Sequence, residues 1–348
     1  MASLSHYGDL PPVARLGGQV GTGLVDVTGD LTALDSTGHW AVVVTYEGQA
    51  ICARFRDWRP ASPYEAVAAD WVGPGPSDWA TSLDHAAYVA GVESIRAAVA
   101  RGDVYQANVC QVRHAPLPDV GRADVAALHL LLEHGNRSPF GGVVRVPGAH
   151  VATASPELFL RRHGSMLESS PIKGTGKTAA DLLPKDRAEN VMIVDLVRND
   201  MSRVSRPGSV SVPSLLHLEQ HPGLVHLVST VRTELVDGAG WPEIFDATFP
   251  PGSVTGAPKT SAVGLLREIE LVPRGPYCGA VGWVDADAGT AELAVGIRTF
   301  WLADDQVWFG TGAGITWDSD PEGEWAECEL KAARLLRVAA GTWEAEES

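Results

Sequence analysis

Apolar and polar positions change their spacing along the chain, and the spacing predicts the secondary-structure elements. Runs rich in β-branched and aromatic residues at 40–46 and 50–55 predict two strands near the amino terminus. Apolar residues then recur at helical spacing from Val89 to Val99. We expect a helix there that Ser82 caps and Gly102 ends.

The rest of the chain mixes both patterns. Residues 185–201 carry apolar side chains on more than one face, which predicts a helix buried between layers. The other expected elements are strands at 104–112, 225–235, 279–285, 291–302 and 306–310, strands and turns at 142–170, and helices at 124–134, after Pro258 and after Pro321. Because strands and helices do not alternate regularly, we expect an α+β fold in mixed layers.

A proline- and glycine-rich break at 73–77 indicates the domain organisation. We expect a short amino-terminal lobe over 1–78, a main domain over 79–341 and an acidic tail over 342–348. No apolar run reaches the roughly 18 residues that span a bilayer, and the first residues lack the charged and apolar regions of a signal peptide. These observations predict a cytoplasmic protein without a membrane partner.

Charge and cysteine content exclude some functions. The formal net charge of −16 disfavours nonspecific binding to nucleic acid. An anionic small molecule is compatible with this charge only where a bound cation or a few basic groups invert the local field. The four cysteines lie far apart without CxxC spacing, so we expect buried thiols and neither a zinc site nor disulfides.

Lys173 is the first candidate for chemistry. Only five of the 27 basic residues are lysines, and Lys173 lies between a proline and a glycine in the segment SPIKGT. A desolvated lysine can lose its proton, whereas arginine cannot, so Lys173 is a candidate nucleophile or base. The alternative is a turn lysine that points into solvent.

Three carboxylates suggest a metal site. Glu324, Glu327 and Lys331 share one face of the expected carboxy-terminal helix, and Glu189 lies on an apolar face of the helix at 185–201. A carboxylate in an apolar layer needs a partner or a metal, and carboxylates from two helices suit Mg²⁺. The alternative for Glu327 and Lys331 is an ordinary surface ion pair.

Further candidates lie in strand contexts. Glu157 precedes Lys173 by sixteen residues, and Arg298 could grip a carboxylate with its planar fork. Structural salt bridges are the alternative for both. The glycines at 310–314 fit no dinucleotide-binding motif, and we interpret them as a turn whose N–H groups hold a carboxylate, or as a plain tight turn.

Taken in order, nine segments resemble the chorismate-utilising enzymes over residues 82–338. They are GDVYQANVCQ at 102–111, SPELFL at 155–160, PIKGT at 171–175, AENVMIVDLVRND at 188–200, HLVSTV at 226–231, FPPGSVTGAPK at 249–259, YCGAVGW at 277–283, GIRTF at 296–300 and GTGAGITWDSDPEGEWAECELKA at 310–332. The resemblance implies a chorismate-binding catalytic domain of the type found in anthranilate synthase component I. Its expected fold is two large β-sheets packed face to face with helices outside.

Within this family, two positions separate the reactions. Members that add water carry a lysine base where this chain has Gln106, so the resemblance implies that water is not the nucleophile. Anthranilate-forming members typically read PIAGT, whereas PIKGT is similar to the members that make 4-amino-4-deoxychorismate, toward 4-aminobenzoate and folate. The resemblance implies that Lys173 is a covalent nucleophile and that Glu157 protonates the leaving 4-hydroxyl.

The resemblance also implies the ligands of the site. Mg²⁺ would be bound by Glu189, Glu324 and Glu327. The substrate carboxylate and ring would contact Gln106, His226, Thr255, Tyr277, Arg298, Gly312, Ala313, Gly314 and Lys331. Ammonia would come from a separate glutamine amidotransferase subunit or from solution. Two alternatives stay open: anthranilate formation, and an inactive scaffold for an amidotransferase.

Overall fold

The computed structural model describes residues 10–62, 71–176, 178–182, 184–221 and 224–342. Within them the helices are α1 (His85–Arg101), α2 (Val125–Gly135), α3 (Pro184–Ser202), α4 (Trp241–Thr248), α5 (Lys259–Ile269) and α6 (Pro321–Ala339). The strands are β1 (Val13–Leu16), β2 (Gln19–Thr28), β3 (His39–Val44), β4 (Ala50–Pro60), β5 (Ala80–Thr81), β6 (Gln106–Pro116), β7 (Phe140–Val146), β8 (Ala149–Ser155), β9 (Leu158–His163), β10 (Met166–Ser170), β11 (Ile172–Gly176), β12 (Ser211–His221), β13 (Leu224–Glu234), β14 (Gly256–Ala257), β15 (Ala280–Asp285), β16 (Thr290–Val295), β17 (Thr299–Ala303) and β18 (Gln306–Ile315).

These strands form one continuous antiparallel network. From β12 and β13 it passes through β10, β9, β16, β15, β3, β4, β2 and β1 to β7. It continues through β8, β17 and β18 to β6, which also pairs with β5 and β14. Strand β11 joins β13 beside β10.

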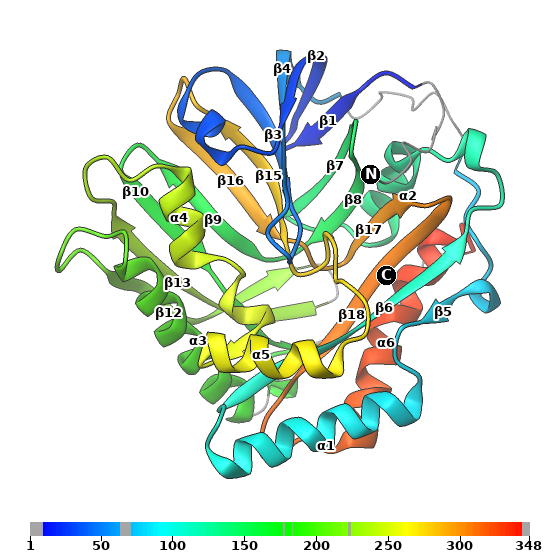
Figure 1. Cartoon of the computed structure of the whole chain (residues 1–348), viewed down its shortest axis with the longest axis vertical. Coiled ribbons are helices and arrows are strands. Elements are labelled where there is room, and N and C mark those ends of the chain that lie inside the picture. The colour runs from blue at the N-terminus through cyan, green and yellow to red at the C-terminus, as the bar shows by residue number, and fades with distance from the viewer. Residues whose placement is uncertain (1–9, 63–70, 177, 183, 222–223, 343–348) are drawn as a thin grey trace.

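The described residues form three buried hydrophobic clusters, and the largest spans distant strands of the network. Trp40 of β3, Leu167 of β10, Val144 of β7 and Val112 of β6 all belong to the same buried cluster, although their strands lie far apart in the network. Figure 1 shows α1 and α6 outside β6 and β18, and α3 and α4 beside the strands at the other end. The expected mixed fold with outer helices is confirmed, with the refinement that hydrogen bonds join all the strands into one network.

Most predicted elements are present, with local corrections. The first expected helix is α1, and Gly102 ends it in a left-handed conformation at φ 81°. Its cap is Asp84, whose carboxylate accepts from Ala87 N, and not Ser82 as predicted. The Ser82 hydroxyl instead accepts a hydrogen bond from Val112 N, which ties the start of the helix to β6.

The predicted amino-terminal lobe is joined to the rest of the molecule by hydrogen bonds. Strand β1 pairs with β7, and β3 pairs with β15. The boundary at residue 78 stays a prediction, and residues 1–9 and 63–70 of this lobe and 343–348 of the predicted acidic tail lie outside the described residues. Among the described helices, none is long and apolar enough to cross a membrane.

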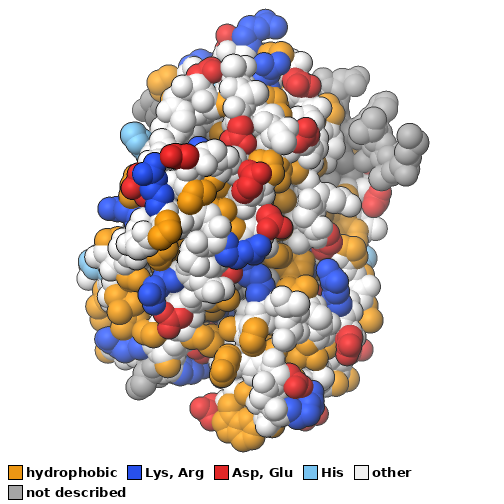
Figure 2. All heavy atoms as spheres, turned by 60° about the vertical axis from the view of Figure 1, so that its left-hand side comes forward, with side chains coloured by type: hydrophobic (Ala, Val, Ile, Leu, Met, Phe, Trp, Pro, Cys, Tyr) orange, Lys and Arg blue, Asp and Glu red, His pale blue; other side chains and the backbone are white. Residues whose placement is uncertain are grey.

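The negative net charge is not gathered on the face that carries β10, β12, β13 and α4. Figure 2 shows acidic and basic side chains side by side there. Glu168 of β10, for example, pairs with Arg232 of β13 at 2.7 Å, and Arg203 pairs with Asp246 of α4 at 2.8 Å.

Candidate functional site

Lys173 lies at an irregular point of β11. The pairing with β13 shifts register between Ile172 and Thr175, so Lys173 and Gly174 form a bulge. Gly174 has φ 85°, and a Cβ there would lie 2.8 Å from Cβ of Asp186 in α3. The glycine of the KGT segment therefore allows the bulge to lie against α3.

Lys173 and Gln106 meet at Gly314, although the three residues come from β11, β6 and β18. A Cβ added at Gly314 would lie 2.2 Å from Gln106 Nε2 and 3.4 Å from Lys173 Nζ. The side chain of Gln106 is buried, and its Oε1 has no hydrogen-bond partner. A buried amide oxygen without a partner is costly, which is typical of a position that a ligand completes.

Glu157 is close enough to Lys173 for the two side chains to interact electrostatically, and it is 4% exposed. Burial raises the pKa of its carboxyl to about 7, while a hydrogen bond with Ser253, the charge of Lys173 and the Ile172 N–H act in the opposite direction. A carboxyl with this pKa is half protonated near neutral pH, as a general acid requires.

The three predicted metal carboxylates lie within electrostatic reach of one another. Burial raises the pKa of Glu189, and the nearby Glu327 contributes to the rise. Burial also raises the pKa of Glu324, whose Oε1 accepts a 2.7 Å hydrogen bond from Ser319, and Glu327 again adds to the rise. Burial acts on Glu327 in the same direction, but Lys331, Lys185 and Lys173 together outweigh it, so its pKa is lowered.

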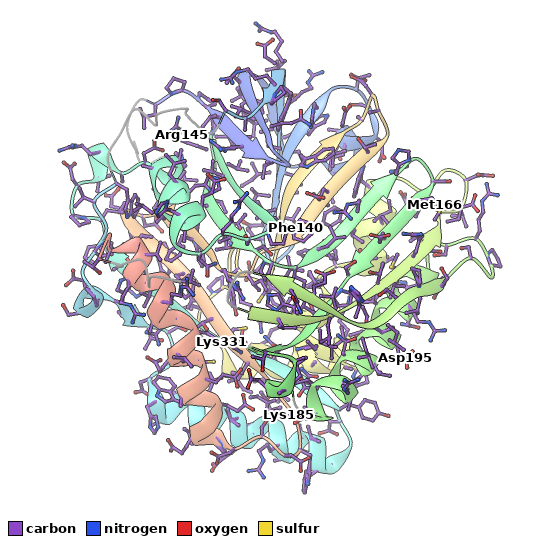
Figure 3. The ribbon with its side chains drawn as sticks, turned by 180° about the vertical axis from the view of Figure 1, so that it is seen from behind. Phe140, Arg145, Met166, Lys185, Asp195 and Lys331 are labelled. Carbon is purple, nitrogen blue, oxygen red and sulfur yellow. The ribbon has the colours of Figure 1, made fainter. Side chains whose placement is uncertain are left out.

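Lysines balance these carboxylates. Lys331 Nζ lies 2.7 Å from Glu327 Oε1, and both side chains are about half exposed at the rim of the site. Lys185, near the start of α3, also acts on Glu189, Glu324 and Glu327. In Figure 3, Lys185 and Lys331 lie in the same region, where α3 and α6 approach each other.

This donor set fits a magnesium ion that keeps most of its waters. Mutual repulsion between carboxylates is the condition that a divalent cation relieves, and all three donors are hard oxygens. In the described part of the chain, no group of three His, Cys, Asp or Glu side chains is close enough to form a complete metal site. Such an ion would therefore take one or two carboxylates and complete its shell with water and an anionic ligand.

The predicted glycine-rich turn at 310–314 is wrong: these residues lie inside strand β18, paired with β6. Glycine is needed for close approach, since a Cβ at Gly310 would lie 2.1 Å from the Tyr277 ring. Strand β17 pairs with β18 only as far as Phe309, so Gly312, Ala313 and Gly314 have a strand partner on one side. The backbone on their other side can still hold a carboxylate.

Arg298 is a partly buried cation at the link between β16 and β17. Its backbone is left-handed at φ 51°. Burial lowers the pKa of its guanidinium, and Arg334 adds to this effect. Within the described residues, its side chain makes no hydrogen bond or ion pair, so its fork is available for an anion.

His226 and Thr255 are buried as well. His226 lies on β13 opposite Thr175 of β11, which places it one pairing step from the Lys173 bulge. The Thr255 hydroxyl donates within its own turn to Pro251 O at 3.2 Å, and its carbonyl accepts from Asn108 N at 2.8 Å. Strand β6 and the turn at 252–255 are thus directly joined.

Sequence reasoning missed several partners of the candidates. Ser253 lowers the pKa of Glu157, Ser319 donates a hydrogen bond to Glu324, and Lys185 and Arg334 act on the carboxylates and on Arg298. The only sequence signal for Ser253 was its place in the segment FPPGSVTGAPK, because its partner lies almost a hundred residues earlier.

A family model described as chorismate binding enzyme matches residues 60–337. The chain belongs to the chorismate-binding enzyme family. Aminodeoxychorismate synthase component 1 of Escherichia coli is 35% identical over 273 residues, which are 75% of this chain and 59% of that protein. An anthranilate synthase component 1 of Haloarcula marismortui is 38% identical over 264 residues, covering 71% of this chain and 52% of that protein. This family member therefore spans between half and two thirds of the length of these two relatives.

Solved structures of the family share the fold. A Bacillus anthracis structure described as a 2,3-dihydroxybenzoate-specific isochorismate synthase has a TM-score of 0.78 at 20% identity, covering 96% of each chain. Anthranilate synthase component I of Streptococcus pneumoniae has a TM-score of 0.76 at 22% identity, covering 95% of this chain and 91% of that one. At these identities the likeness establishes the fold and leaves the reaction open.

Proposed function

We propose that this chorismate-binding enzyme aminates chorismate at ring carbon C4 and yields 4-amino-4-deoxychorismate, toward 4-aminobenzoate and folate. The observation that carries the proposal is the position of Lys173, whose amine lies beside the Gln106 amide and within reach of the buried Glu157 carboxyl. In this proposal the Lys173 amine attacks, the Glu157 carboxyl protonates the leaving group, and the neutral Gln106 amide does not activate water as a base would.

In the first step, the neutral amine of Lys173 forms a bond to C2 as both conjugated ring double bonds shift and the C4–O bond breaks. Glu157 transfers its proton to the departing oxygen, which leaves as water. In the second step, ammonia forms a bond to C4, both double bonds shift back and the bond between C2 and Lys173 breaks. The proton that the new amine loses returns to the Glu157 carboxylate. Two displacements at opposite ends of one conjugated diene give retention at C4.

The other candidates orient the substrate in this proposal. Arg298 and the backbone of Gly312 to Gly314 hold the enolpyruvyl carboxylate, and Tyr277 packs beside them. His226, Thr255 and Lys331 line the remainder. Glu189, Glu324 and Glu327 would hold Mg²⁺, which when bound neutralises the ring carboxylate of the substrate.

The proposed reaction needs a source of ammonia. All four cysteines are free and buried, so none is placed to attack glutamine from solvent. We propose a separate glutamine amidotransferase subunit as the source, with ammonia in solution as the substitute in a purified system.

The proposal is tested by product analysis. Purified protein incubated with chorismate, Mg²⁺ and ammonium should yield 4-amino-4-deoxychorismate, separated by chromatography from its isomers. Anthranilate would support the alternative that both the identity of the relatives and the shared fold leave open. Isochorismate would contradict amination, and a folded protein without turnover would indicate the scaffold.

A further inference from the structure

A buried arginine lies beneath the proposed site. Arg274 is 1% exposed, and each nitrogen of its guanidinium donates a hydrogen bond. Nε and Nη2 donate to the two carboxylate oxygens of Glu270 at 2.8 and 2.7 Å. The guanidinium also lies over the ring of Tyr46, 4.2 Å from its centroid.

Its remaining donors bind two backbone carbonyls of the site. Nη1 donates to Val254 O and Nη2 to Asn108 O, each at 2.8 Å. Val254 lies between Ser253 and Thr255 in the turn that follows Pro251, and Asn108 lies two residues after Gln106 on β6. The same arginine therefore fixes the backbone beside three residues of the proposed site.

Glu270 extends this arrangement to a third point. Its Oε1 accepts a hydrogen bond from Cys110 N at 3.0 Å, so the carboxylate also holds β6. The Arg274 and Glu270 pair thus joins β6, the turn at 252–255 and the end of α5. Asn108 N donates directly to Thr255 O at 2.8 Å, which closes the connection between strand and turn.

Burying the Arg274 and Glu270 ion pair costs desolvation free energy, which indicates that the pair has a role other than stabilising the fold. A buried ion pair is often no more stabilising than a well-packed apolar pair of the same volume. The apolar substitute, however, cannot donate to Val254 O and Asn108 O. What the guanidinium supplies in particular is the position of the two backbone segments that carry Ser253, Thr255 and Gln106.

We propose that Arg274, held by Glu270, is a positioning residue that fixes the turn at 252–255 against Glu157 and β6. It acts through Ser253, which lines the same cavity as Glu157, and through Asn108. The inference rests on the proposed function only in taking Glu157 as the proton donor. The titratable groups that face Arg274 are Glu270, Cys110, Cys278, Tyr46 and Tyr277, and the charged group that faces Glu157 is Lys173.

The test uses a neutral double variant, Glu270→Leu with Arg274→Met, so that no buried charge is left alone. We expect it to fold with a lower melting temperature, because Val254 O, Asn108 O and Cys110 N each lose a hydrogen bond, and to lose at least about tenfold in kcat through misplacement of the acid. Because the Ser253 hydrogen bond lowers the pKa of Glu157, its loss should move the alkaline limb of the pH–rate profile to higher pH. The readout is chorismate consumption from pH 5 to 9.

A cycle with Ser253→Ala separates positioning from general damage. Ser253→Ala alone should produce the same upward movement of the limb, and it should add nothing in the double-variant background. The matched control is Asp124→Asn with Arg145→Met, which removes another buried ion pair and keeps the α2 cap. That control should leave the limb in place.

Clear outcomes overturn the inference. A folded double variant with the wild-type alkaline limb and kcat would do so. A shift of the limb by Ser253→Ala that adds in full to the shift of the double variant would also do so. If the double variant does not fold, Arg274→Lys keeps the charge beside Glu270 but cannot bind both carbonyls, and it should move the limb in the same direction. A folded Arg274→Lys protein with the wild-type profile would equally overturn it. Because consumption of chorismate is measured, amination at C2 would defeat the proposed function and leave this test readable.

Discussion

The charge of Lys173 acts on the buried carboxyl of Glu157 from the neighbouring strand and partly offsets the rise in pKa that burial causes. The two side chains come from β11 and from the link between β8 and β9, sixteen residues apart in the chain. An opposite charge close to a carboxyl favours its ionised form. The relation joins the proposed nucleophile to the proposed acid.

Glu157→Gln should make stability less dependent on pH. The folded-state pKa of about 7 lies above the ordinary value of 4.5, so folding favours the protonated carboxyl. The stability that this group contributes is full below about pH 4.5 and is lost as pH rises through 7. At pH 8 the glutamine variant should gain up to about 3 kcal/mol in unfolding free energy over the wild type, and little at pH 4. Urea unfolding at both pH values measures this. An equal difference in unfolding free energy at both pH values would contradict the raised pKa of Glu157. The control is Glu322→Gln, at an exposed glutamate.

Lys173→Ala should lower C4 amination by about a thousandfold or more, because the covalent route is removed. Lys173→Arg is the matched variant: it keeps a cation beside Glu157 but supplies no nucleophile, and it should be equally inactive. Product chromatography should also be inspected for anthranilate, since loss of the amine opens direct attack by ammonia at C2. An unchanged rate and product in either variant would rule out Lys173 as the nucleophile.

Gly314→Ala should displace the Gln106 amide, since the added Cβ would lie 2.2 Å from Nε2. We expect a loss of about 1–3 kcal/mol in unfolding free energy and a lower kcat/KM for chorismate. Gly264→Ala is the control, because a Cβ there meets nothing within 4 Å in helix α5 and should stabilise by up to about 1 kcal/mol. Full activity of Gly314→Ala would show that Gln106 and Lys173 need not lie together at this glycine.

Removal of a metal carboxylate should weaken Mg²⁺ binding to the free protein. Glu189→Gln and Glu327→Gln should each lower the affinity at least about tenfold in titration calorimetry. The control is Glu322→Gln. Glu322 lies on the same helix as Glu327 and pairs with His85, and this variant should bind Mg²⁺ like the wild type. Unchanged affinity in both site variants would place the metal elsewhere. Chelation of the metal with EDTA should correspondingly abolish turnover, and addition of Mg²⁺ should restore it.

Local patterns predicted much of the fold. The helix ended by Gly102, the helix at 185–201 and the strands at 279–285 and 306–310 follow from spacing and punctuation in the sequence. The cap of α1 was misassigned because Ser82 and Asp84 are both good caps, and a tertiary bond from Val112 N occupies Ser82. Strand β12 and helix α4, which is only eight residues long, were not among the predicted elements.

The sequence indicated which residues are candidates for the site, but not how they are arranged in space. The motif at 310–314 suggested a turn, because glycines usually mark one, whereas these glycines allow Tyr277 and Gln106 to approach a strand. The contacts of Ser253 with Glu157 and of Arg274 with Val254 join segments far apart in the chain, and no local pattern encodes them.

The position of the new carbon–nitrogen bond tests the central claim most directly. Wild-type protein supplied with chorismate, Mg²⁺ and ¹⁵N-ammonium should give a product whose ¹⁵N couples to C4 of the ring in the NMR spectrum. The proposed attack of Lys173 at C2 predicts nitrogen at C4 with the configuration of the lost hydroxyl. A product with ¹⁵N bonded to C2, either as the aminated ring or as anthranilate, would contradict the account.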